Sequence, residues 1–526
     1  MSEGPESGSI IKMKVSIGER VCTGLSTARG FYFLITAMVV LYFIFRGLLY
    51  PAAPSDDAEQ LLFSQTFRWG YDVVNPPLYT WLVIGVQKLV GVEVFSVSLV
   101  KFPAYWLIFQ FMYLCARRVV DDPRLAVLAA LSPFWLYYVA WDSVMSYSHS
   151  VLVTALIMAA LHGVLRLYEK PVFSAYVILG VLLGLGVMAK YTFGLFVLAL
   201  LIAVVAYRPF RPIILNPRIL ITLGIAALIA SPHIYWLVEQ SEVIGGAVSG
   251  KFEVGVGGEF FATRLKGLAS AFTSGLGFIS PLWLVLLIVF WRPLRERLKV
   301  HEVIPPTAKF LAIYMLAVAG LITAMVIAFG VSKVRAHYMF VFIPFPLVFF
   351  AWLEPMLKDR RPVRIYTLSL AFISAFLVTG VVVKWVSEPL RCKRCQLMVP
   401  YADIGQKIRE IGFKDGTIFA YYFPHDLAGN LRPEFPNTRI VSTKYPHITR
   451  PVSETPGQCL MLWVPLPIGV KDARGMTQHS NALMGTTLPL EDPFPENPLH
   501  FEIERSNGRT SKIHYMLYDP GIGECR

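Results

Sequence analysis

Long apolar runs constrain this chain more than any other feature. Several reach the length of about 20 residues that an α-helix needs to cross a bilayer. Hydrophobic residues make up 55% of the 526 positions and charged residues only 16%, whereas soluble domains carry about a quarter of charged residues. The pattern predicts about eleven spans, at Phe31–Leu49, Phe95–Cys115, Leu125–Trp141, Ser150–Leu167, Phe173–Met188, Thr192–Tyr207, Ile219–Val238, Leu276–Trp291, Phe310–Phe329, Met339–Leu353 and Tyr366–Trp385.

The net charge of +13 is distributed in step with these predicted spans. Basic residues gather in alternate loops, among them Arg117, Arg118, Arg124, Arg208, Arg211 and Arg218. Under the positive-inside rule such loops are cytoplasmic, and the intervening loops, including Tyr50–Asn75, face outward. The charge is therefore a topology signal, and we expect membrane lipids and no nucleic acid as partners.

An odd number of spans places everything after Trp385 outside. We predict a basic cytoplasmic N-terminus at 1–29, a transmembrane domain at 30–385 and a small extracytoplasmic α+β domain at 386–526. Within the last region, Thr417–Tyr422 and Cys459–Val464 are short apolar runs bounded by turn residues. Such runs favour buried strands.

Four of the six cysteines lie in this outer region. Because exported compartments favour disulfides, the candidate pairs are Cys392 with Cys395 and Cys459 with Cys525. A redox or metal-binding role for the Cys392/Cys395 pair remains an alternative, and the sequence does not fix the connectivity.

The first outer loop carries an acidic cluster, Asp56, Asp57 and Glu59, directly after the first span. The apolar residues of Glu59–Trp69 predict an amphipathic helix in the plane of the membrane, with Trp69 and Tyr71 as interface anchors. A solvated loop would tolerate the acids, but neither reading explains why they cluster at the end of a span.

Two further outer hairpins are cationic. Lys190 stands in a short turn between two spans, and Lys333, Arg335 and His337 alternate in a second turn, followed by Tyr338. Lysine can snorkel to the interface without further role. However, these cations lie on the side that the positive-inside rule disfavours, which indicates an anion site. A phosphate-bearing lipid, with a carboxylate for group transfer, would use all three elements.

The order of these motifs resembles a known family. "DDAEQ", "NPPLYTWL", "MAKYT" and "KVRAHYMFVFIPFPLVFF" follow one another between Asp56 and Phe350. This order is similar to that of GT-C class polyprenyl-phosphate-sugar glycosyltransferases. It is closest to the bacterial protein-mannosyltransferase-like group, which includes the aminoarabinose lipid A transferase and the rhizobial lipopolysaccharide galacturonosyltransferases.

The resemblance implies a polytopic α-helical GT-C fold in the bacterial inner membrane, with the active site and the C-terminal domain facing the periplasm. It implies inverting transfer of a sugar from a polyprenyl-phosphate donor to a lipid or glycan acceptor, such as lipid A, lipopolysaccharide core or another cell-surface glycan. It implies no certain cofactor. A divalent metal at Asp56 and Asp57 is left open.

The resemblance also assigns roles. Asp56 takes the place of the catalytic carboxylate and Asp57 the second acidic position. The donor phosphate would be bound by a set of cations and tyrosines, namely Lys190, Tyr191, Lys333, Arg335, His337 and Tyr338. The acceptor, or the support of the catalytic groups, would involve Glu59, Gln60, Tyr71, Asn75, Asp142 and His149.

The sequence departs from the family pattern at two places. Asn75 stands where relatives have histidine before Pro-Pro, and Ser148-His149 stands where many relatives have Pro-Asp at the start of the fourth span. If that second acid helps catalysis or orders a metal, either Asp142 or His149 must substitute for it or this member works differently. Three alternatives therefore stay open: a lipid-phosphate transporter or flippase, a protein O-glycosyltransferase, and a non-catalytic glycan-binding scaffold. Against the transporter, no internal repeat is visible in the hydropathy.

Overall fold

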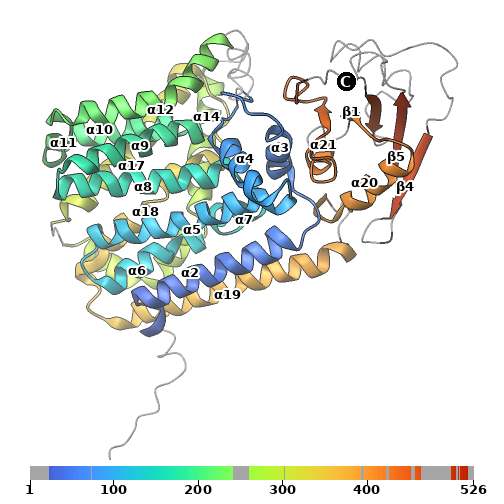
Figure 1. Ribbon diagram of the computed structural model, residues 1–526. Helices are drawn as coiled ribbons and strands as arrows, with labels where there is room; N and C mark the ends of the chain where they lie inside the picture. Colours follow the sequence, from blue (N-terminus) through green and yellow to red (C-terminus); the bar gives the residue numbers. More distant parts are fainter. Residues whose placement is uncertain are drawn as a thin grey trace, which may run out of the picture.

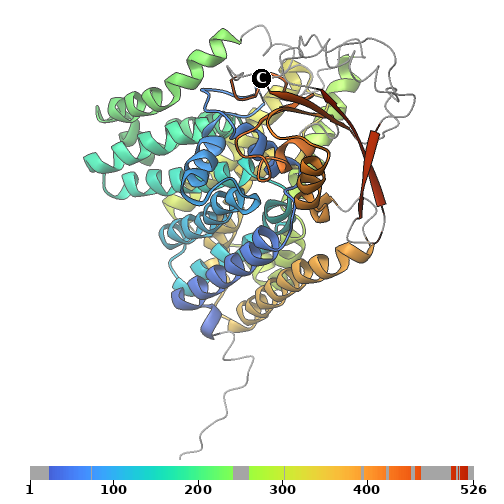
Figure 2. The ribbon, with the colours of Figure 1, turned by 45° about the vertical axis from the view of Figure 1, so that its right-hand side comes forward.

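The computed structural model describes residues 23–240, 260–391 and 396–518, with gaps at 73, 301–302, 422–425, 452–456, 464–498, 505–507 and 509. These residues form a helical bundle and a smaller sheet-containing domain beside it (Figure 1). The last long helix of the bundle, α19 (Arg360–Arg391), leads into the sheet domain (Figure 2). It continues past residue 386, where the predicted domain boundary lies.

The bundle contains long helices joined by shorter helical turns. Its helices in chain order are α2 (Ala28–Tyr42), α3 (Ser55–Phe63), α4 (Leu78–Val90), α5 (Val94–Val119), α6 (Pro123–Leu131), α7 (Ser143–Met145), α8 (His149–Glu169), α9 (Phe173–Ala189), α10 (Phe193–Ala206), α11 (Arg211–Leu215), α12 (Ile219–Glu239), α14 (Phe260–Phe278), α15 (Leu282–Val289), α16 (Trp291–Arg297), α17 (Pro306–Phe329), α18 (Phe345–Leu353) and α19.

In the described part of the chain, seven helices are long and apolar enough to cross a membrane, or eight if the bent pair α10 and α11 is one span. The predicted span at Phe173–Met188 is the shorter apolar helix α9. Two predicted spans are wrong as continuous helices. The run 125–141 breaks after Leu131, where Pro133 follows, and the run 276–291 is divided before Pro281. Proline cannot donate a helical hydrogen bond, and hydropathy does not register that loss.

The C-terminal domain is built on a five-stranded mixed sheet in the order β2-β1-β3-β5-β4. The central strand β1 (Gly416–Tyr421) runs parallel to β2 (Arg439–Ser442) and β3 (Gln458–Trp463). Strands β4 (Leu499–Glu504) and β5 (Thr510–Tyr518) are antiparallel additions. With helices α20 (Tyr401–Glu410) and α21 (Asp426–Asn430), this confirms the α+β prediction and both predicted buried strands.

The cysteine predictions are met only in part. Cys459, on β3, is disulfide-bonded. The other candidate cysteines, Cys392, Cys395 and Cys525, lie outside the described residues, so both proposed pairings stay predictions.

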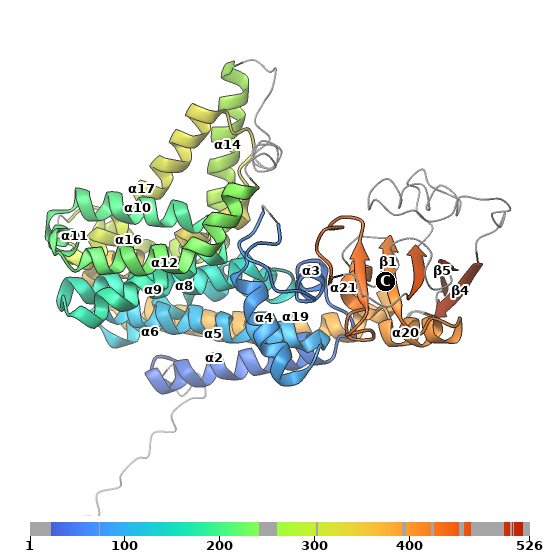
Figure 3. The same ribbon diagram turned by 45° about the horizontal axis from the view of Figure 1, so that its top comes forward.

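The two ends of the bundle differ in character. Helices α3 and α7 lie at the end nearest the C-terminal domain, and the arginine-bearing α11 lies at the opposite end (Figures 1 and 3). The acidic cluster and the basic loop at Arg208–Arg218 are therefore at opposite ends, as the charge pattern predicts.

Helix α3 corrects one expectation. It is packed between the bundle and the C-terminal domain and does not lie as an exposed helix in the membrane plane. Leu61 belongs to the hydrophobic core of the bundle, whereas Leu62 and Phe63 belong to that of the C-terminal domain. Tyr71, expected as an interface anchor, is also buried in the latter core, while Trp69 is half exposed.

Candidate active site

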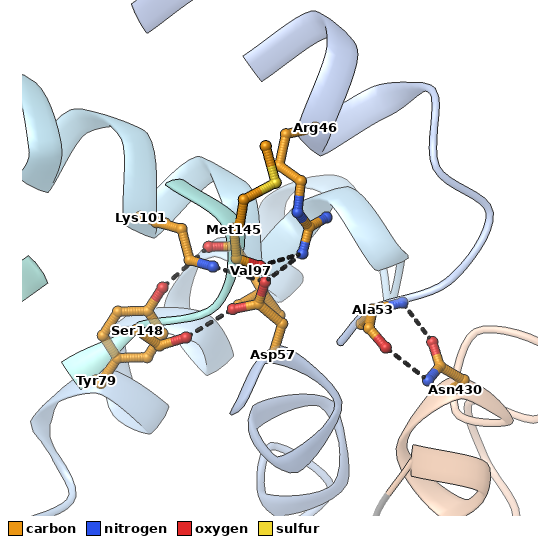
Figure 4. A network of polar contacts seen from close by, with 9 residues as sticks. All are labelled: Arg46, Ala53, Asp57, Tyr79, Val97, Lys101, Met145, Ser148 and Asn430. Carbon is orange, nitrogen blue, oxygen red and sulfur yellow. Dashed lines mark hydrogen bonds and ion pairs between the residues drawn. The ribbon is translucent and has the colours of Figure 1, made fainter. Parts of the chain in front are cut away.

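Asp57 is the centre of a buried ion-pair network (Figure 4). Its Oδ2 lies 2.7 Å from Lys101 Nζ on α5 and 3.2 Å from an Arg46 guanidinium nitrogen at the end of the first span. The Ser148 hydroxyl donates to Asp57 Oδ1 at 2.6 Å. Arg46 also donates to the carbonyl of Met145. Two cations and a hydroxyl hold this buried carboxylate in place, so Asp57 is a structural anchor for α3.

Asp56 has a different environment. It is only partly buried and accepts a hydrogen bond from the backbone N–H of Ser148. Burial raises the pKa of its carboxyl above the ordinary value, and the charge of Asp57 adds to that effect. Lys101, Lys190 and the Ser148 N–H act in the opposite direction. A carboxylate with a raised pKa accepts a proton more readily than an ordinary aspartate.

Ser148 therefore binds both acids, one through its hydroxyl and one through its N–H. It is the residue before the first turn of α8, whose amino end carries a partial positive charge. Next to it, the Lys190 ammonium donates to Ser150 Oγ at 2.6 Å. Arg46, Lys101 and Lys190 thus bring positive charge to the two carboxylates of α3.

Gln60 and His149 connect α3 to the Lys190 hairpin. Thr80 Oγ1 donates to Gln60 Oε1 at 2.6 Å, which directs the amide nitrogen of Gln60 toward His149 Nε2 at 3.1 Å. His149 Nδ1 lies 3.2 Å from the carbonyl of Ala189, so Nδ1 carries the proton and Nε2 accepts. His149 is thus a neutral link between α3 and the residue next to Lys190.

Glu59 and Tyr71 lie on the side of the C-terminal domain. The Tyr445 hydroxyl donates to Glu59 Oε2, and Lys444 Nζ lies 3.7 Å from the same oxygen. Burial raises the pKa of Glu59 to about 7. Tyr71 stacks on Phe63 and donates its hydroxyl to a backbone carbonyl, that of Thr66. Both residues serve the junction between the two domains in this structure.

The second cationic hairpin lines a pocket of about 560 Å³. Lys333 and Arg335 are both exposed, and they share the pocket with Asp142. Its remaining lining consists mainly of hydroxyl-bearing side chains: Tyr138, Tyr147, Ser270, Thr273 and Ser274. Tyr147, which lines the pocket, interacts electrostatically with both Asp142 and Asp56, and so links the pocket to Asp56. Two cations facing one acid among hydroxyls suit a phosphate or a carboxylate ligand.

The remaining predicted residues are placed as follows. The Tyr191 hydroxyl lies 3.0 Å from His233 Nε2, and Asn75 pairs with Asp72 in an isolated β-bridge. Tyr338 is in the 3₁₀ turn Ala336–Phe342 that follows Arg335. The side chain of His337 lies outside the described part.

The structure gives no direct support to a metal at Asp56 and Asp57. Within the described residues, no group of three or more histidine, cysteine, aspartate or glutamate side chains could hold a metal ion. Asp57 already has two cations as partners, so the pair offers a metal little free carboxylate.

Sequence reasoning missed Arg46, Lys101 and Ser148. The signal was available for two of them, because Arg46 and Lys101 are charged residues within predicted spans, where such residues are costly and functional. For Ser148 the resemblance marked only its position, at the start of the fourth span, and its bonds to both carboxylates depend on how the amino end of α8 meets α3.

Comparison with known proteins finds a matching family model and two similar glycosyltransferases. Residues 74–236 match the model of the dolichyl-phosphate-mannose-protein mannosyltransferase family. Over 469 residues the chain is 26% identical to the lipopolysaccharide core galacturonosyltransferase RgtB of Rhizobium johnstonii, covering 86% of this chain and 92% of that protein. It is 26% identical over 447 residues to RgtA of the same organism, covering 82% and 85%.

Among solved structures, the fold is similar to that of ArnT from Cupriavidus metallidurans bound to undecaprenyl phosphate. The TM-score is 0.58 at 14% identity, over 93% of this chain and 98% of ArnT. Apo ArnT gives a TM-score of 0.55 at 13% identity, over 92% and 97%. The chain thus resembles GT-C glycosyltransferases both in the family match over residues 74–236 and in its overall fold, which confirms the resemblance predicted from its motifs.

Proposed function

We propose that the protein is an inverting membrane glycosyltransferase that moves a sugar from a polyprenyl-phosphate donor to an envelope glycan. The observation that carries this proposal is the position of Asp56. Its carboxylate has a raised pKa, interacts electrostatically with Lys190, accepts from the Ser148 N–H at the amino end of α8, and is linked through Tyr147 to the pocket that contains Lys333 and Arg335.

The donor phosphate would be held by Lys190 and by the pocket cations. In the reaction, the bond between the anomeric carbon and the phosphate oxygen breaks, and negative charge grows on the leaving polyprenyl phosphate. Cations that are already in position stabilise this charge most in the transition state. Lys190, Lys333 and Arg335 would supply that stabilisation.

Asp56 would act as the general base. It removes the proton of the acceptor hydroxyl as the oxygen attacks the anomeric carbon from the face opposite the phosphate, so configuration inverts. Asp57 is unsuited to this role, because its oxygens are occupied by Lys101, Arg46 and Ser148.

The substrates proposed first are those of the relatives. RgtA and RgtB are named for lipopolysaccharide core and galacturonic acid, so a uronosyl donor and a lipopolysaccharide acceptor are the first combination to test. The pocket cations Lys333 and Arg335 would also suit a donor whose sugar carries a carboxylate. By the positive-inside rule, the end of the bundle with α3 and the C-terminal domain faces the periplasm of the inner membrane.

The test has two parts. First, mass spectrometry of envelope glycolipids from cells with and without the protein should show one sugar missing when the protein is absent. Second, purified protein in detergent should consume a polyprenyl-phosphate uronic acid only when acceptor glycolipid is added.

Other outcomes would contradict the proposal. Movement of the donor across vesicles without its consumption would mean a transporter. Transfer to a polypeptide, with glycolipids unchanged, would mean a protein O-glycosyltransferase.

A further inference from the structure

Helix α3, which carries Asp56, has two faces that belong to different domains. Asp57, Gln60 and Leu61 contact the bundle. On the opposite side, Gly429 approaches the backbone carbonyl of Ala58 and Leu62 lies in the core of the C-terminal domain, while Gln65, just past the end of the helix, bonds to that domain. The bundle alone therefore fixes only one side of the helix.

The C-terminal domain binds the chain at both ends of α3. Before the helix, the Ala53 N–H donates to Asn430 Oδ1 at 2.7 Å, and Asn430 Nδ2 donates to the Ala53 carbonyl at 3.1 Å. After the helix, Gln65 Nε2 donates to the carbonyls of Ile440 and Ile448 at 3.0 and 2.8 Å. The side chains of Asn430 and Gln65 are buried, so these bonds are shielded from water.

A third contact lies at the middle of the helix. Gly429, on α21, approaches α3 so closely that a Cβ atom there would lie 1.9 Å from the Ala58 carbonyl oxygen. The backbone of Gly429 is not in the left-handed region, so its lack of a side chain serves this approach and not a turn. Ala58 is two residues from Asp56.

We propose that the C-terminal domain is a positioning part of the catalytic site. The latch formed by Asn430, Gly429 and Gln65 sets the height and rotation of α3, and so the point at which the Asp56 carboxylate meets the acceptor hydroxyl. This inference rests on the proposed function, and it gives the C-terminal domain a role that neither the charge pattern nor the motifs assign to it.

The reason is geometric. General-base catalysis needs the carboxylate within hydrogen-bond reach of the attacking hydroxyl, and an error of about 1 Å can cost about 100-fold in rate. Donor binding depends on Lys190, Lys333 and Arg335, which are attached to the bundle. A displaced α3 should therefore lower kcat and leave the donor KM nearly unchanged.

The experiment compares Gly429→Ala and Asn430→Ala with the control Gly85→Ala, in full-length protein in detergent. Gly85 is exposed on α4, and an added Cβ there meets nothing within 4 Å. We expect kcat to fall about 10- to 100-fold in both latch variants, with the donor KM within about twofold of wild type. The control should keep wild-type kcat.

Amide hydrogen exchange of residues 55–65 gives a readout that needs no substrate. In the latch variants, exchange in α3 should rise while exchange in α5 and α8 stays as in the wild type. This separates displacement of one helix from general unfolding, which would raise exchange in all three helices.

The outcomes are distinguishable. The positioning role is overturned if the wild-type protein catalyses transfer and the latch variants keep the wild-type kcat. It is also overturned if these variants lose kcat only together with protection from amide exchange in α5 and α8. If wild-type protein shows no turnover with any polyprenyl-phosphate sugar, the proposed function fails, while raised exchange confined to α3 would still support the latch.

Discussion

Asp56 and Asp57 are adjacent on α3 and are both bound by Ser148, yet they face different surroundings. The Ser148 hydroxyl donates to Asp57, which is also held by Lys101 and Arg46. The Ser148 N–H binds Asp56, whose pKa is raised by burial and by the charge of Asp57. Of the two neighbouring acids, Asp57 is thus a structural anchor and Asp56 is the candidate base.

Replacing the anchor should affect folding first. Asp57→Asn removes the one carboxylate that both buried Lys101 and Arg46 contact, and removing one partner of a buried pair costs about 3–5 kcal/mol. Thermal unfolding in detergent should show a large loss of stability in this variant. Adding Lys101→Met should recover part of that loss, and a double variant as unstable as the sum of both single variants would contradict a direct coupling.

The pH profile should report the environment of Asp56. Because its pKa lies above the ordinary value, kcat/KM should decline at acid pH with a midpoint above that of a free aspartate. Lys190 lowers this pKa, so Lys190→Met should move the acid midpoint upward, whatever it does to donor binding. A midpoint that stays in place or moves downward would place the titrating group elsewhere.

Glu59 should make the domain junction sensitive to pH. Its pKa is about 7 in the folded state and about 4.3 in an unfolded chain. The folded protein thus holds more protons between these values, and its stability is lost as pH rises from about 4 through 7. Glu59→Gln, measured by thermal unfolding at pH 5 and pH 8, should flatten this dependence. An equal slope in the variant and the wild type would contradict the assignment.

The negative charge of Asp142 should weaken the binding of the donor phosphate in the pocket that also contains Lys333 and Arg335. Asp142→Asn removes one negative charge from the pocket that contains Lys333 and Arg335, so inhibition by free polyprenyl phosphate should become stronger, by a few-fold. Arg335→Gln is the matched opposite change and should weaken the inhibition. If Asp142→Asn also weakened it, the phosphate would not sit in this pocket.

Some features could be predicted from the sequence because they depend on local pattern. The order of motifs led to the GT-C resemblance. Lys190 interacts electrostatically with Asp56, as expected of the first cationic hairpin, and Tyr147 links Asp56 to the pocket of the second. The strands around Ile418 and Leu460 followed from short apolar runs.

Other features depend on distant packing, which no local pattern reveals. The sequence pattern suggested that Leu62 and Phe63 face the membrane. An apolar helix face has the same sequence pattern whether it packs against lipid or against another domain. Asn430 is 377 positions from Ala53, and Gly429 contacts α3 only because the C-terminal domain folds back on the bundle. Breaks at Pro133 and Pro281 disturbed two spans for backbone reasons that hydropathy does not contain.

The most direct test of the account is the turnover of Asp56→Asn, which preserves shape and removes the base. Purified wild-type and variant protein would be given a polyprenyl-phosphate uronic acid and a lipopolysaccharide acceptor, and donor binding would be measured in parallel. The account predicts that transfer falls by at least about 100-fold while donor affinity and thermal stability stay close to wild type. Transfer at near wild-type rate in Asp56→Asn would contradict it.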